Sequence, residues 1–211
     1  MTPRPKTVSD EQILAATARV IGRTGPQHLT LAEVGSEAGL SAATLLQRFG
    51  SKRELLLALA AAGAGSGGDL FEAARSAHPT AIDALIEVMA CMGQMARTPE
   101  EMAHHLAFLQ MDLSDTEFHH FTAIQFQKTL TGIERLLVDA TDGGELVCPD
   151  TRSLARAVQS MANGAILNWA IHREGTAEDA IRADLRVLLA PYRPGAETVN
   201  WSSNRRSGSN G

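Results

Sequence analysis

The chain has 211 residues, a formal net charge of −5 and an apolar fraction of 44%, which is enough to form a sizeable core in one large or two small domains. Its longest apolar run, Leu55 to Gly65, is shorter than the ~18 residues that a membrane span needs. No export signal is recognisable at the N-terminus, and Cys91 and Cys148 lie far apart. We therefore expect a cytoplasmic protein with reduced thiols and no membrane partner.

The first predicted elements are helices. Alanine and leucine abound while isoleucine, valine, tyrosine and tryptophan are scarce, which predicts an all-α protein. Ser9 followed by Gln12 has the form of a capping box, and apolar residues recur from Ile13 to Ile21, so a helix is expected over about 10–23. Gly25-Pro26 then ends it.

Two short helices follow. Thr30 can cap a helix that ends at Gly39, and Ser41 can cap another that runs from Ala42 to Phe49. Residues 29–49 thus form a candidate helix-turn-helix, in which the second helix buries Leu45 and turns its opposite face toward a DNA major groove.

The charge distribution agrees with a DNA-binding N-terminal part. Residues 1–56 carry seven Lys and Arg against five acidic residues, whereas the remainder carries twelve against nineteen. A mildly basic head on an acidic body is compatible with DNA, although a balance of +2 is weak evidence by itself.

A fourth helix opens at Lys52 and meets the glycine-rich stretch 63–68, which contains the pattern G-x-G-x-x-G. Because a helix precedes it and no βαβ unit surrounds it, a dinucleotide site is not expected. The glycines instead predict a helix C-cap and a flexible connector, where alanine at Gly65 and Gly67 should alter the response to an effector.

Longer helices are expected in the remainder. Apolar residues with a helical period predict helices from Ile82 to Ala96, from near Pro99 to Leu113, over about 116–139, over about 150–174, and from Thr176 to Leu189. The tail after Tyr192 is rich in Ser, Asn and Gly and is expected to be disordered.

One stretch of the sequence is specific enough to indicate a protein family. Leu29-Thr30-Leu31-Ala32-Glu33-Val34, Ala38-Gly39-Leu40-Ser41, Thr44-Leu45, Phe49, Ser51-Lys52 and Leu55-Leu56 closely resemble the TetR family of bacterial repressors over about 40 residues. The resemblance implies a flexible arm (1–6), a DNA-binding domain (7–67) with its helix-turn-helix at about 30–49, a ligand-binding and dimerisation domain (68–192), and a disordered tail (193–211).

The resemblance also implies contacts with DNA. By position it assigns the following residues to the DNA interface: Thr30, Ser41, Ala42, Ala43, Thr44, Gln47, Arg48 and Lys52. Hydroxyls at helix starts suit phosphates, and Gln47 suits an adenine edge. Thr30 and Ser41 can also be caps only, and Lys52 a solvated charge. Leu46 stands where the family usually has an aromatic residue, so affinity is expected to depend on Arg48 and on an Arg4/Lys6 arm.

Methionine and aromatic residues concentrate where the resemblance places the effector cavity. The candidate contacts are Met89, Met92, Met102, His105, Phe108, Phe121, Phe126 and Asn163. Such side chains suit a small, mostly apolar effector. Taken singly, each apolar member is more often a residue of the plain core. Asn163 and Asn168 can orient a ligand, face solvent, or pair across a dimer.

The family resemblance further implies a homodimer built from the last two long helices. Ala155, Ala162 and Ala165 are small enough for two copies of one helix to approach closely. A symmetric dimer presents its recognition helices about one DNA turn apart, ~34–36 Å, so we expect a roughly palindromic operator. The function predicted is a ligand-responsive repressor that releases DNA when the effector binds.

Two other functions compete. A metal- or thiol-sensing repressor could use Cys91 or the two histidine pairs, His104-His105 and His119-His120. An enzyme is disfavoured because adjacent histidines point about 100° apart on a helix and no H-E-x-x-H, paired-Cys or nucleophile motif occurs. No cofactor or metal is therefore expected.

Overall fold

The computed structural model describes residues 8–196, apart from the side chains at positions 66 and 67. Over this range the chain is helical and contains no strand: α1 (Asp10–His28), α2 (Leu31–Ala38), α3 (Ala42–Phe49), α4 (Lys52–Ala77), α5 (Ala81–Ala90), η1 (Cys91–Met95), α6 (Pro99–Ser114), α7 (Thr116–Asp142), α8 (Thr151–His172), α9 (Ala177–Leu189) and η2 (Ala190–Tyr192). The predicted arm 1–6 and most of the predicted tail 193–211 lie outside the described residues.

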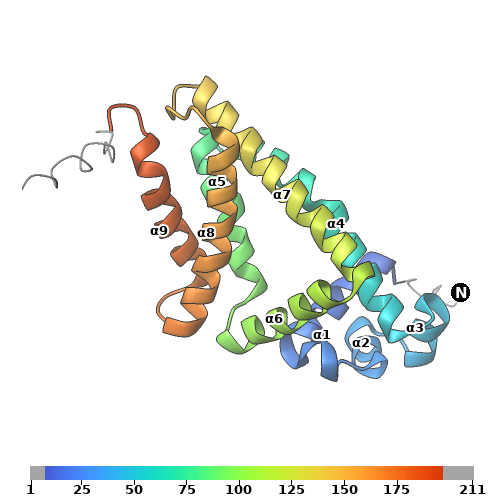
Figure 1. Ribbon diagram of the computed structural model, residues 1–211. Helices are drawn as coiled ribbons and strands as arrows, with labels where there is room; N and C mark the ends of the chain where they lie inside the picture. Colours follow the sequence, from blue (N-terminus) through green and yellow to red (C-terminus); the bar gives the residue numbers. More distant parts are fainter. Residues whose placement is uncertain (1–7, 197–211) are drawn as a thin grey trace, which may run out of the picture.

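Figure 1 shows two parts joined by long helices. Helices α1, α2 and α3 form a head at one end, and α5, α8 and α9 lie at the other. Helices α4 and α7 run side by side between them, and α6 crosses beside α1. The all-α prediction is confirmed.

Helix starts agree with the sequence because each carries its own cap. The Ser9 hydroxyl accepts the Gln12 backbone N–H at 3.2 Å, and the Gln12 side chain accepts the Ser9 N–H at 3.0 Å. Thr30 and Ser41 cap α2 and α3 as predicted. Each cap satisfies backbone donors that a helix start leaves unpaired.

Two glycines shape the head. Gly39 ends α2 with a φ of 69°, a left-handed conformation that costs glycine little. Gly35 is required for a different reason, since a Cβ there would lie 2.7 Å from the Leu40 carbonyl oxygen. The turn therefore packs directly on the backbone of α2, and residue 35 has no room for a side chain.

The expected connector at residues 63–68 is wrong. Helix α4 continues through it to Ala77, and none of these glycines has a positive φ. The expected boundary between residues 67 and 68 thus falls inside one helix. Packing against α7 holds the segment helical. Ala64 is buried, and a Cβ added to Gly63 would lie 3.6 Å from the side-chain oxygen of Gln125 in α7. Tertiary contacts here outweigh the low helix propensity of glycine.

A second difference concerns α5. The apolar period to Ala96 predicts one helix, but the α-helix ends at Ala90 and a 3-10 helix continues to Met95. A Cβ on Gly93 would lie 2.7 Å from the backbone nitrogen of Glu178. The close approach of α9 accompanies this change of helix type.

Among the described residues three apolar clusters result: a body core, a head core, and a small cluster of Ala96, Trp169 and Ala177. The body core joins α5, α7, α8 and α9, with Phe71 from α4. The head core joins α1, α2, α3 and the start of α4, and it also includes Phe118 of α7. Phe108 and Met111 of α6 pack against this head core. The α6–α7 corner of the body is therefore docked on the head.

Candidate DNA-binding surface and effector region

The recognition helix α3 is anchored by one face and open on the other. Leu45 is fully buried in the head core, and Phe49 is half-buried against it. Ala43, Leu46 and Gln47 lie on the exposed side. The helix-turn-helix geometry predicted from the sequence is present, with a free face on α3 of the kind that enters a major groove.

Hydroxyl groups near α3 keep one proton for an outside acceptor. The Ser41 Oγ lies 2.8 Å from the Thr44 Oγ1, and it also accepts the Thr44 backbone N–H at 3.1 Å. One hydroxyl proton serves the bond between the two side chains. The other remains available, so this pair can still donate to a phosphate.

Thr30 is committed to its cap. Its hydroxyl donates to the Glu33 carboxylate at 2.9 Å and accepts the Glu33 N–H at 3.2 Å. The hydrogen bond from Thr30 is the main reason that the pKa of Glu33 is lowered. Because the hydroxyl proton is already used on an anion, a phosphate would have to compete for it.

Every cation of the described head has an internal partner. Arg48 contacts the Asp10 carboxylate at 2.5 Å and donates to the Val8 carbonyl at 2.7 Å. Lys52 donates one of its three N–H groups to the Gln27 carbonyl at 2.9 Å. The remaining three pair with carboxylates: Arg19 and Arg23 with Glu37, and Arg53 with Asp115 and Glu117. Lys52 therefore keeps two N–H donors for a phosphate. Arg4 and Lys6 lie outside the described residues.

Arg53 links the head to the body. Its guanidinium lies 2.8 Å from the Asp115 carboxylate, 2.7 Å from that of Glu117, and 5.6 Å from the centre of the Phe118 ring. The hydrogen bond from Arg53 lowers the pKa of Asp115. A second link joins His104 Nδ1 to the Gly22 carbonyl oxygen at 2.7 Å. Neither link could be predicted from the sequence, because the paired residues are 62 and 82 positions apart.

The candidate effector residues do not form one group. Met89, Met92 and Met102 belong to or pack against the body core. Phe108 and Phe121 pack against the head core instead.

The other three candidates differ in exposure. His105 is half-buried, and burial lowers its pKa. Phe126 and Asn163 are exposed. The structure therefore separates side chains that the sequence pattern grouped together.

Asp112 is the one buried carboxylate among the described residues. Only 7% of it is exposed, and its Oδ1 has no hydrogen-bond partner there. Burial raises the pKa of this carboxyl group, while a hydrogen bond from Thr122 acts in the opposite direction. A buried polar atom without a hydrogen-bond partner lowers the stability of the folded state. The contacts within the chain therefore do not account for the Asp112 Oδ1 in the α6–α7 region.

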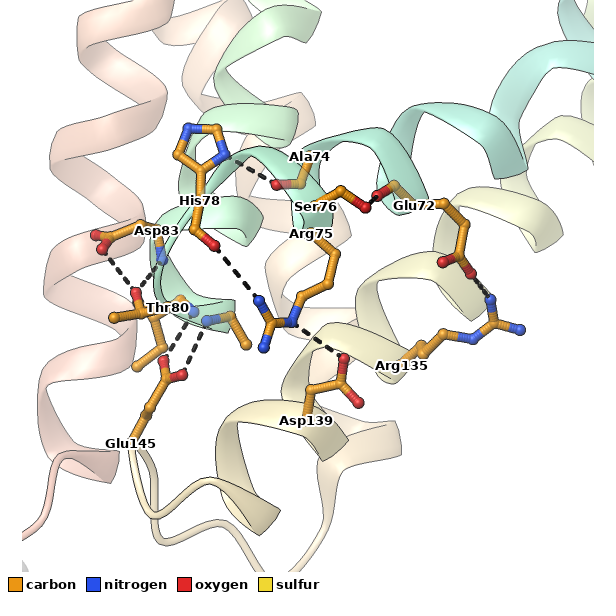
Figure 2. Close-up of polar contacts among 12 residues, drawn as sticks. Glu72, Ala74, Arg75, Ser76, His78, Thr80, Asp83, Arg135, Asp139 and Glu145 are labelled. Atoms are coloured by element: carbon orange, nitrogen blue, oxygen red, sulfur yellow. Dashed lines mark hydrogen bonds and ion pairs between the residues drawn. The ribbon is translucent and has the colours of Figure 1, made fainter.

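The corner between α4 and α5 is held by polar contacts (Figure 2). The Glu145 carboxylate accepts the backbone N–H groups of Ala81 and Ile82 at 2.8 and 3.0 Å, at the start of α5. Arg75 pairs with Asp139 of α7 at 3.4 Å. A carboxylate at a helix N-terminus is favourable, so this corner is well fixed and lies far along α4 and α7 from the head.

Helices α8 and α9 turn apolar residues outward. Leu167 and Ile171 of α8 and Val187 of α9 are exposed. The expectation that Ala155, Ala162 and Ala165 face another copy is wrong, since all three are buried in the body core of their own chain. The period of α8 allowed either face, and packing against the rest of the body decided which one is inside.

The metal- and thiol-sensing alternative concerns histidines and cysteines in the described part of the chain. No three His, Cys, Asp or Glu residues there come together in a way that could hold a metal ion. Cys91 is exposed and Cys148 is buried, both as free thiols. No described helix is long and apolar enough to cross a membrane.

Comparisons with known proteins agree with this geometry. The family model of bacterial regulatory proteins of the tetR family matches residues 13–59, and that of the C-terminal part of BetI-type transcriptional repressors matches residues 80–192. The HTH-type transcriptional regulator BetI of Rhizobium meliloti (strain 1021) is 29% identical over 193 residues, which cover 85% of this chain and 91% of that protein.

Solved structures show the same fold at low identity. PfmR of Thermus thermophilus superposes with a TM-score of 0.61 at 22% identity, over 84% of this chain and 96% of its own. SmeT, the repressor of a Stenotrophomonas maltophilia efflux pump, gives 0.63 at 22%, over 89% and 91%. FadR of Bacillus subtilis gives 0.64 at 17%, over 86% and 98%.

The fold and the free face of α3 define a helix-turn-helix DNA-binding protein with a helical regulatory body. The chain belongs to the TetR family of transcriptional regulators, with a body of the BetI repressor type.

Proposed function

We propose that this regulator binds a roughly palindromic operator as a homodimer, represses transcription from it, and releases it when a small effector binds the body. The observation that carries the proposal is α3, which buries Leu45 and leaves Ala43, Leu46 and Gln47 open. The similarity to BetI-type repressors favours repression. A regulator of this kind acts on the chromosome, which supports a cytoplasmic location.

Most of the residues that the sequence assigns to the DNA interface remain in the proposed interface. Gln47 is exposed and suits an adenine edge, and Ala42 and Ala43 allow a close approach of α3. Thr44 or Ser41 and Lys52 donate to phosphates with the protons that their internal bonds leave free.

Thr30 and Arg48 have a different proposed role. Thr30 positions α2, and Arg48 holds α3 against the start of α1 through Asp10. Both then support the orientation of α3, and Lys52 with the N-terminal arm supplies the charge that meets the backbone.

The proposed dimer interface uses the outer faces of α8 and α9. Leu167, Ile171 and Val187 supply exposed apolar area, and Gly164 has nothing within 4 Å of an added Cβ. A close approach of two α8 helices is therefore possible at Gly164, on the face opposite to the buried alanines. A two-fold axis there makes a four-helix bundle and sets two copies of α3 against successive major grooves.

The proposed effector is small and mostly apolar and binds between α6 and α7. Half-buried Phe108 of α6 and Phe121 of α7 supply apolar contacts there, and FadR of Bacillus subtilis, which shares the fold, was solved with stearoyl-CoA. The unpartnered Oδ1 of Asp112 favours an effector that also carries a hydrogen-bond donor. Arg53 and His104 would transmit the bound state to the head, because they join α6 and α7 to it.

Selection of bound duplexes from a random pool tests the proposal. We expect inverted half-sites whose centres lie about 10 base pairs apart or a multiple of that, and a binding constant that falls steeply with salt because phosphate contacts release counterions. Gln47→Ala and Lys52→Ala should both weaken binding. Purified protein that enriches no sequence at low ionic strength would rule the proposal out.

A compound screen for release of the selected operator then tests the effector. Asp112→Asn should weaken the response to compounds that carry a donor and spare the response to those that do not. Leu113→Ala, on the exposed side of α6, is the matched control.

A further inference from the structure

The open face of α3 is more apolar than a DNA-binding surface usually is. Leu46 is 51% exposed, and Ala42 and Ala43 lie four and three residues before it. On a helix these spacings bring side chains to one face. The result is a small methyl-rich patch beside the amide of Gln47.

The polar side chains that could cover this patch are held elsewhere. Arg48 is drawn to the start of α1 by Asp10 and the Val8 carbonyl. Ser41 and Thr44 hydrogen bond to each other at the N-terminus of the helix. Leu46 therefore remains open on the same side as Gln47, within the surface that this family fold turns toward DNA.

Base edges in the major groove differ in whether they accept an apolar neighbour. Guanine, adenine and cytosine present acceptors or amino donors, whereas thymine adds a C5 methyl group beside its single acceptor. A leucine placed over a polar edge removes water without replacing its hydrogen bonds. Placed over a thymine methyl, it buries apolar surface on both sides.

We infer that Leu46 is a specificity-determining residue of the DNA interface, which selects thymine in each half-site by packing against its C5 methyl group. The inference rests on the proposed operator binding and names what one position of that operator must be. Gln47 reads the neighbouring position through hydrogen bonds, so the half-site contains a thymine beside the base that Gln47 contacts.

The expected size of the effect follows from the buried methyl group. One buried carbon group of this kind is worth about a fourfold change in Kd, and a change in both half-sites of a dimer about sixteenfold. This is large enough to measure by fluorescence anisotropy at fixed salt.

Deoxyuridine supplies the test, because it differs from thymidine only by lacking the methyl group. The selected operator is remade with deoxyuridine at one thymine position at a time, in both half-sites together. For the wild-type protein we expect one position whose substitution weakens binding about sixteenfold. Leu46→Ala should bind the thymidine and deoxyuridine versions of that position equally.

Gln47→Ala is the matched control. It should bind more weakly overall but keep the deoxyuridine penalty, since its contact is separate from the methyl group. Circular dichroism checks that Leu46→Ala folds, which is expected because the side chain is exposed.

The outcomes separate the two claims. A wild-type protein that binds its selected operator but tolerates deoxyuridine at every position overturns the role of Leu46 while leaving operator binding intact. A Leu46→Ala variant that keeps the full penalty does the same. A protein that selects no duplex at all overturns operator binding, and the role of Leu46 with it.

Discussion

The head and the body of this protein use buried and exposed groups differently. In the head, each described cation has an internal partner, and the turn lies against the backbone of Gly35. In the body, Asp112 is buried with an unpartnered oxygen, and α8 and α9 expose apolar side chains. A domain that must present one fixed face benefits from tight closure. A domain that binds an effector and a second copy keeps polar and apolar groups that have no partner within their own chain.

The largest expected effect is at the anchor of α3. Leu45→Ala removes a fully buried side chain and should cost about 2–5 kcal/mol of unfolding free energy. Thermal and denaturant unfolding measure the cost, and operator binding should be lost with it. Leu113→Ala, at a leucine that is 69% exposed in the body, should change stability by no more than about 0.5 kcal/mol. Equal costs for the two variants would refute the packing assigned to α3.

Gly35→Ala and Gly22→Ala sharpen the comparison within the head. Both glycines lie in helices, but an added Cβ meets the Leu40 carbonyl oxygen at position 35 and nothing within 4 Å at position 22. Gly35→Ala should therefore destabilise by about 1–3 kcal/mol. Gly22→Ala should stabilise by about 1 kcal/mol through helix propensity.

Denaturant titration with an unchanged m-value reports both changes. A stabilising Gly35→Ala variant would show that the turn does not lie against α2 as described.

Asp112→Asn tests the buried carboxylate through pH. Because burial raises the pKa of Asp112, the folded protein holds this proton at pH values where the unfolded chain has lost it. Stability from this group is therefore present at low pH and is lost as pH rises through the folded-state pKa.

Removing the charge should then stabilise the protein by about 1 kcal/mol at pH 8, with the gain shrinking as the pH is lowered. Melting curves of both proteins across pH measure this. A gain that grows toward acid would contradict the direction of the shift.

The smallest effect is expected at the junction. Arg53→Gln removes an exposed charge cluster with Asp115 and Glu117, and such pairs contribute about 0–1 kcal/mol. Arg135→Gln, which breaks the exposed pair with Glu72, should cost as little. The two variants should differ in function, because only Arg53 joins the head to α7. Effector-dependent release should change for Arg53→Gln and stay as in the wild type for Arg135→Gln.

The short helices of the head could be predicted from the sequence because their signals are local. Thr30 and Ser41 cap helices that begin one residue later, and Gly39 ends the first of them with a left-handed φ. Capping and turn chemistry act within four residues, so they need no knowledge of distant parts. The candidate DNA-binding residues, in contrast, came from the resemblance of this stretch to the TetR family.

Long-range packing decided the rest. Six residues with four glycines predict a break at 63–68, yet α4 stays helical there because α7 lies alongside it. The small alanines of α8 were compatible with either a dimer interface or the interior of the chain, and in the structure they are buried in the body core. The pairing of Arg48 with Asp10 and of Arg53 with Asp115 joins residues 38 and 62 positions apart. Contacts at such distances depend on how helices pack against one another, which periodicity along a single helix does not specify.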